Sequence, residues 1–195
     1  VHPTVEFAKK YFNSKFGKTE CWYFLSCAES AHVYLGFKEG VSREEWISAV
    51  CRQDIDGMLS MLNKLPVKNG DCVFVEGGVP HAIGEGCFMI EVQEPSDLMG
   101  VVEKKTPSGK EIADIKLHGG IGFDNMLKMF AYKGENLDEI KERYTYSPKK
   151  LRENVYEVIG KSVTDKFSIH VIEGGGKITP PNKNGTVIIT DGKGS

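Results

Sequence analysis

The chain has 195 residues, of which 40% are hydrophobic and 27% are charged, and its formal net charge is −2. This composition is typical of a folded globular protein and argues against intrinsic disorder. Because Lys and Arg are not in excess, we expect no general nucleic-acid-binding surface. The apolar runs are too short to span a bilayer and no signal peptide is visible, so we expect a cytoplasmic protein with no membrane partner.

The five cysteines form no C-x-x-C pair, and most of them lie within apolar runs. Reduced, buried thiols are typical of cytoplasmic proteins, and we expect that state here. The cysteines concerned are Cys21, Cys27, Cys51, Cys72 and Cys87.

In the first third of the chain, the spacing of apolar residues predicts a helix over 3–12 and strands over 18–28 and 31–37. Ser42, with Glu45 three residues later, forms a capping-box motif that begins a helical region. We expect that region to run to residue 65, with a break near 52–54.

The remainder is rich in short strands. We expect strands over 71–76, 80–84, 87–93 and 99–105, helices over 123–132 and 137–142, a linker over 146–151, and strands over 155–159, 167–173 and 186–190. Many short strands separated by turns predict a mainly β fold, a sandwich or barrel with inserted or appended helices. The chain lacks an initial Met and ends with a strand whose hairpin partner is missing, so we expect part of a longer protein.

His81 follows a Gly-rich turn and Pro80 at the start of a predicted strand. A single His in this position is more often a surface residue. Together with His2 and Glu20, however, it offers two imidazoles and a carboxylate, a set that suits zinc and also accepts Mn, Fe or Co. Strand alternation places Lys18 and Glu20 on one face, either inside a barrel or as an exposed pair at a strand edge.

Four segments in order give a more specific signal: Val-His-Pro at 1–3, Gly-Lys-Thr-Glu-Cys-Trp-Tyr at 17–23, Pro-His-Ala-Ile-Gly at 80–84, and Ile-Glu-Val-Gln-Glu-Pro-Ser-Asp at 90–97. Up to about residue 145, the chain resembles the class I phosphomannose (mannose-6-phosphate) isomerases in their short bacterial form. The resemblance implies a cupin jelly roll over residues 1–145. It also implies that residues 146–195 begin a second, cupin-like β domain.

The resemblance further implies an aldose–ketose isomerase acting on mannose 6-phosphate and fructose 6-phosphate, with one zinc ion held by His2, Glu20 and His81. Lys18 matches a residue lining the substrate pocket, and Glu91 matches an inward-facing carboxylate. Either could carry the proton between C1 and C2 of the sugar. Gln93 shares the face of Glu91 and is expected to contact substrate.

The chain departs from the family at two positions. The family has an Arg, thought to act on the sugar phosphate, where this chain has Val101. Alternation along the strand expected at 99–105 makes Lys105 the nearest replacement cation, although Lys lacks the bidentate fork of Arg. The family's Gln ligand would fall before Val1. Both departures favour the alternative of a weak or inactive cupin that binds a sugar or sugar phosphate. The sequence carries no signal for an oligomeric state.

Overall fold

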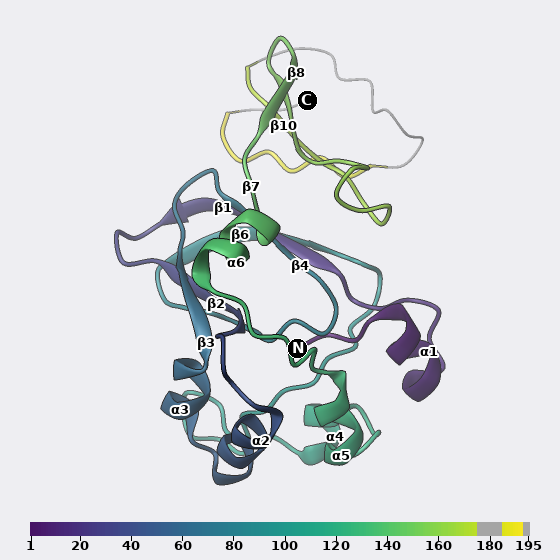
Figure 1. The fold of residues 1–195 in the computed structure, drawn as a ribbon. Helices are drawn as coiled ribbons and strands as arrows, with labels where there is room; N and C mark the ends of the chain where they lie inside the picture. The colour runs from purple at the N-terminus through teal and green to yellow at the C-terminus, as the bar shows by residue number, and fades with distance from the viewer. Residues whose placement is uncertain (175–184, 193–195) are drawn as a thin grey trace.

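A computed structural model describes residues 1–174 and 185–192 of the chain (Figure 1). It contains three antiparallel sheets, with short helices gathered mainly at one end, and the expected mainly β fold is confirmed. Among the described residues, no helix is long and apolar enough to cross a membrane.

Two of the sheets face one another and form a sandwich. The first has the strand order β6 (Cys87–Gln93), β1 (Glu20–Cys27), β4 (Cys72–Val75) and β7 (Thr145–Tyr146). The second has the order β3 (Leu62–Pro66), β2 (His32–Phe37) and β5 (His81–Ile83). The third sheet comprises β10 (Ile169–Ile172), β9 (Val155–Ile159) and β8 (Lys149–Arg152).

Alternation along β1 decides what each of its faces contacts. Trp22 and Phe24 point into the sandwich and share a core cluster with Val33 of β2. Cys21 points to the opposite face, where it packs with Ile159 of the third sheet. Strand β1 is therefore covered on both faces. Glu20 lies two residues before Trp22, so it points to the same face and is buried inside the sandwich.

The helices are short. They are α1 (Val5–Phe12), α2 (Arg43–Arg52), α3 (Ile55–Ser60), α4 (Asp114–His118), α5 (Phe123–Met126) with the 3-10 turn η1 (Leu127–Met129), and α6 (Leu137–Tyr144). Helices α1, α2, α3 and α6 each have a side-chain N-cap. The capping box of Ser42 and Glu45 is present. The expected break is also present, because Gln53 adopts the left-handed conformation and Asp54 caps α3.

The structure corrects the end of the expected 42–65 helix. Helix α3 ends at Ser60, and residues 62–66 form β3, which pairs along its length with β2. Leu62 and Leu65 are buried by that pairing, so tertiary contacts outweigh the local helical spacing. The helix expected over 123–132 is also shorter, since η1 ends at Met129.

The strand expected at 99–105 is wrong: these residues, all within the described part of the chain, form only an isolated bridge between Lys105 and Glu111. Their backbone groups bond to loops instead, with the Val101 N–H donating to the carbonyl of Leu117 at 2.9 Å. The alternation argument that placed Lys105 beside Val101 therefore has no strand to support it.

Two expectations near the C-terminal end are also corrected. Residues 186–190 form no strand within the described segment 185–192, since no neighbouring strand there hydrogen-bonds to them. Most of the expected linker at 146–151 is taken up by β7 and β8. Because β7 pairs with β4 and β8 begins the third sheet, the change of sheet falls just after residue 146. The domain boundary at residue 145 stays a prediction.

Candidate metal centre

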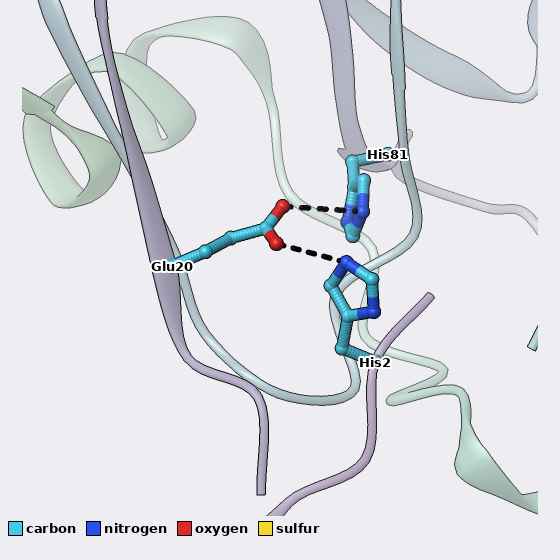
Figure 2. A group of neighbouring side chains, drawn as sticks. All are labelled: His2, Glu20 and His81. Atoms are coloured by element: carbon cyan, nitrogen blue, oxygen red, sulfur yellow. Dashed lines mark ion pairs between the residues drawn. The ribbon is translucent and has the colours of Figure 1, made fainter. Parts of the chain in front are cut away.

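Three side chains from distant parts of the chain converge inside the sandwich (Figure 2). Glu20 begins β1, His81 begins β5, and His2 lies just before α1. One ligand atom from each lies within 4.8 Å of the others. His2 Nε2 is 2.9 Å from Glu20 Oε2, and His81 Nε2 is 3.6 Å from Glu20 Oε1.

The segment that carries His2 is fixed by its backbone and by two glycines. The His2 carbonyl accepts a hydrogen bond from Gly78 N–H at 2.7 Å, which ties it to the turn before His81. A Cβ added at Gly17 or Gly77 would lie 2.8 or 2.7 Å from the carbonyl oxygen of Pro3. These distances are too short for a carbon atom, so both positions need glycine for the ligands to meet.

We expect Gly77→Ala to weaken metal binding by roughly tenfold or more, as when a residue supporting a ligand is lost. The added methyl group meets backbone atoms of residues 3 and 4 and must push the His2 segment away. Titration with zinc followed by calorimetry measures the change. Gly185→Ala is the matched control, because no described residue lies within 4 Å of the Cβ added there. Equal affinity in both variants would contradict this account of the glycine.

Backbone carbonyls orient both imidazole rings. Nδ1 of His81 lies 2.9 Å from the carbonyl of Val79, and Nδ1 of His2 lies 3.2 Å from that of Leu98. Because a carbonyl only accepts, each Nδ1 carries the proton and each Nε2 is left to face Glu20. An Nε2 lone pair and a carboxylate oxygen repel one another unless a proton or a metal ion lies between them, and a metal ion can take the place of the proton. The donor set therefore fits a metal ion.

The charge states favour the same conclusion. Burial lowers the pKa of His81 well below its usual value, and nearby positive charges lower it further, so this ring is neutral at neutral pH. Burial alone would raise the pKa of Glu20, but His2 and Lys18 outweigh it and leave the pKa below its usual value. Glu20, with a side chain only 1% exposed, is ionised and could serve as a metal ligand.

Lys18 and Glu91 lie beside this cluster. The Lys18 ammonium is 3.3 Å from Glu20 Oε2 and 3.7 Å from Glu91 Oε1. Lys18 is buried, whereas the Glu91 side chain is 36% exposed and so lies where a solvent-borne ligand can reach it. The sequence allows Lys18 and Glu20 to lie either inside a barrel or exposed at a strand edge. In the structure both are buried inside the sandwich.

Gln93 lies on the same inner face of the sheet as Glu91, but its side chain is already hydrogen-bonded. It lies opposite Glu20 in the β1–β6 register, and its side-chain N–H donates to the carbonyl of Ser96 at 2.9 Å. Trp22, which the sequence offers only as a core residue, sets its ring edge-on to His81 with centroids 5.4 Å apart. Neither this contact nor the carbonyls that orient the histidines leaves a signal in the sequence.

Known proteins match both the sequence and the fold. No protein-family model matches the chain. Over 97 residues, half of its length, the chain is 37% identical to mannose-6-phosphate isomerase ManA of Bacillus subtilis. Over the same length it is 40% identical to mannose-6-phosphate isomerase of Streptococcus mutans. The resemblance to the mannose-6-phosphate isomerases is confirmed. The matched part is about 30% of the length of these relatives.

Solved mannose-6-phosphate isomerases extend the match in fold. The enzyme from Bacillus subtilis superposes on 87% of this chain and 49% of its own, with a TM-score of 0.63 and 24% identity. A putative mannosephosphate isomerase from Archaeoglobus fulgidus covers 81% of this chain and 45% of its own, with a TM-score of 0.57 and 21% identity. At this level of identity the match shows the fold, and the cupin-type architecture is confirmed.

The two positions that the family resemblance relates to phosphate binding lie outside the cluster of candidate ligands. Val101 is half-buried in the irregular segment after β6, and Lys105 is exposed further along it. Lys104, the other nearby cation, lies with its ammonium 5.0 Å from the ring centre of Phe123. Among the described residues the cluster thus comprises the three candidate ligands with Lys18 and Glu91, while Lys105 as a substrate contact stays a prediction.

Proposed function

We propose that this chain carries the metal centre and catalytic residues of a mannose-6-phosphate isomerase. The reaction interconverts mannose 6-phosphate and fructose 6-phosphate by moving a proton between C1 and C2. The observation that carries the proposal is the buried cluster of His2, Glu20 and His81 beside Lys18 and Glu91. Its partner is a small sugar phosphate. A cytoplasmic location belongs to the proposal and is supported by the free, buried thiols of Cys21 and Cys72.

Zinc is the metal we propose, one ion per chain, held by the Nε2 atoms of the two histidines and the carboxylate of Glu20. When bound, zinc acts as a Lewis acid that polarises the carbonyl and hydroxyl oxygens of the sugar. The protein orients these ligands through the carbonyls of Val79 and Leu98. It also shields them from water, because Glu20 and His2 are both buried.

Glu91 is the residue we propose as the proton carrier. It is a carboxylate on the inner face of β6, partly exposed, and 3.7 Å from the Lys18 ammonium. An ammonium has three donors and no acceptor, so Lys18 suits stabilisation of negative charge on a sugar oxygen. We therefore assign proton transfer to Glu91, and stabilisation of the negative charge that develops on the sugar oxygen to Lys18.

A coupled assay for fructose 6-phosphate, run on the full chain loaded with zinc, tests the proposal. We expect turnover of mannose 6-phosphate that is lost on chelation and restored by added metal. Saturable binding of mannose 6-phosphate without turnover would overturn the proposal and support the second candidate.

The second candidate is a cupin that binds a sugar or sugar phosphate without converting it. Val101 favours it, because the matched family position holds an Arg and an isopropyl group cannot bind a phosphate. The two candidates differ in how the chain anchors the phosphate of the sugar.

We expect Val101→Arg to raise kcat/KM for mannose 6-phosphate about tenfold, equivalent to about 1.4 kcal/mol of transition-state stabilisation. The Val101 backbone is fixed by its hydrogen bond to Leu117, so the new side chain starts from a defined position. Steady-state kinetics measure the change, with Val187→Arg as a control at a side chain that is 70% exposed. No gain, combined with strong activity of the unaltered chain, would show that the phosphate is anchored elsewhere.

A further inference from the structure

Cys27 and Cys87 face one another at the end of the β1–β6 pair. They are directly opposite in the register of the two strands. The Ala28 N–H donates to the Gly86 carbonyl at 2.9 Å, while the Cys27 N–H donates away from β6, to Asn69 Oδ1 at 2.7 Å. This is the pattern of a non-hydrogen-bonded antiparallel pair, in which the Cα atoms are about 4.5 Å apart.

That separation is within the range that a disulfide spans, about 4.4–6.8 Å between Cα atoms. Residues directly opposite one another place their side chains on the same face of the sheet. Both thiols are free and half-buried, and both pack against the edge of the same core cluster. The two sulfur atoms can therefore meet with little movement of the backbone, and solvent can reach them.

The other three cysteines do not combine directly opposite positions on paired strands with access to solvent. Cys21 lies opposite Phe74, and Cys72 lies opposite Tyr23, so these two cysteines form a diagonal pair. Diagonal Cα positions are about 7–8 Å apart, beyond the range of an unstrained disulfide, although the thiols of Cys21 and Cys72 are close enough to hydrogen-bond, which raises the pKa of Cys21. Both thiols are also fully buried, out of reach of an oxidant in solution. Cys51 is exposed on α2, away from this pair of strands.

We propose that Cys27 and Cys87 form a reversible cross-strand disulfide when a low-molecular-weight disulfide, such as oxidised glutathione, is present. One cysteine thiolate attacks the small disulfide, which forms a mixed disulfide and releases one small thiolate. The second cysteine thiolate then attacks the protein sulfur of the mixed disulfide and releases the other. Two protein thiols are oxidised, one small disulfide is reduced to two small thiols, and the protein loses two hydrogens.

The environment of the thiols sets the conditions for the reaction. Burial raises the pKa of both thiols, and for Cys27 the nearby Cys87 and Asp71 raise it further. Exchange is therefore slow at neutral pH and is best measured at about pH 8.5, near the pKa of an unperturbed thiol. Cys27 lies at the opposite end of β1 from Glu20, roughly 20 Å along the strand, so the metal content is expected to stay unchanged.

The test treats the reduced full chain with oxidised glutathione, blocks remaining thiols with N-ethylmaleimide, and maps the peptides by mass spectrometry. Of the five thiols, we expect three to be lost: Cys27 and Cys87 in one cross-link that joins their peptides, and the exposed Cys51 as a mixed disulfide with glutathione. Because the bond closes a long loop of chain, the melting midpoint should rise by roughly 5 °C and return on reduction.

Three variants make the result specific. Cys51→Ser should form the same cross-link. Cys27→Ser and Cys87→Ser should each stop at the mixed disulfide on the remaining cysteine, with a circular dichroism spectrum like that of the unaltered chain. A stable mixed disulfide on Cys27 or Cys87 in the unaltered chain, a cross-link involving Cys21, Cys51 or Cys72, or five thiols that persist would each overturn the proposal.

Discussion

Glu20→Gln is expected to abolish metal binding and to lower turnover at least about 10³-fold, a loss of about 4 kcal/mol of transition-state stabilisation. Glu20 lies between the two histidines and, within residues 1–174 and 185–192, is the one carboxylate that contacts both of them. Its amide counterpart has almost the same shape but supplies no negative charge to balance the cation. Elemental analysis of the purified protein and the coupled assay measure the two losses.

Glu44→Gln is the matched control, since Glu44 is exposed on α2 and the same chemical change there leaves the metal centre untouched. We expect it to retain one metal ion per chain and full turnover. If Glu20→Gln held as much metal as Glu44→Gln, Glu20 would not be a ligand. The cluster would then be a buried network of ion pairs.

Glu91→Gln is expected to lower kcat by about 10²- to 10⁴-fold, the usual contribution of a general acid–base residue, with the metal retained. Glu91 contacts Lys18 and lies at the partly exposed side of the cluster, where the sugar must approach. The same variant should stop exchange of the C1 and C2 hydrogens with solvent. Isotope exchange monitored by NMR, together with kcat, measures both effects.

Lys18→Ala is the comparison that separates the two roles. We expect it to lower kcat while leaving the metal and some hydrogen exchange in place, because its ammonium stabilises charge rather than carrying the proton. Full exchange in Glu91→Gln with none in Lys18→Ala would reverse the assignment. Loss of metal in Lys18→Ala would mark Lys18 as a support for the Glu20 strand.

The sequence predicts most of the sandwich because its strands carry strong alternation or β-branched and aromatic residues. Strands β1, β2, β4 and β6 lie within about two residues of their expected bounds. Strand β3 escapes prediction, because its apolar residues also fit the spacing of the preceding helix and only pairing with β2 decides between the two. The segment at 99–105 has strand-forming residues but no partner, so its chemistry alone is misleading.

The candidate metal centre shows a different limit of prediction from sequence. The ligand residue types could be read from the sequence, but their spacing, from His2 to Glu20 to His81, follows no local rule and gained meaning only through resemblance to a family. Three-dimensional convergence depends on the glycines beside Pro3 and on carbonyls that orient the imidazoles. Backbone carbonyls are the same at every position, so no residue pattern reveals them.

Anomalous X-ray diffraction at the zinc edge, on crystals of the zinc-loaded full chain, tests the central claim most directly. The account predicts a single strong peak, with His2 Nε2, His81 Nε2 and a carboxylate oxygen of Glu20 each about 2.0–2.2 Å away. A peak bound by other residues, or Glu20 paired with the two histidines without a metal between them at saturating zinc, would contradict it.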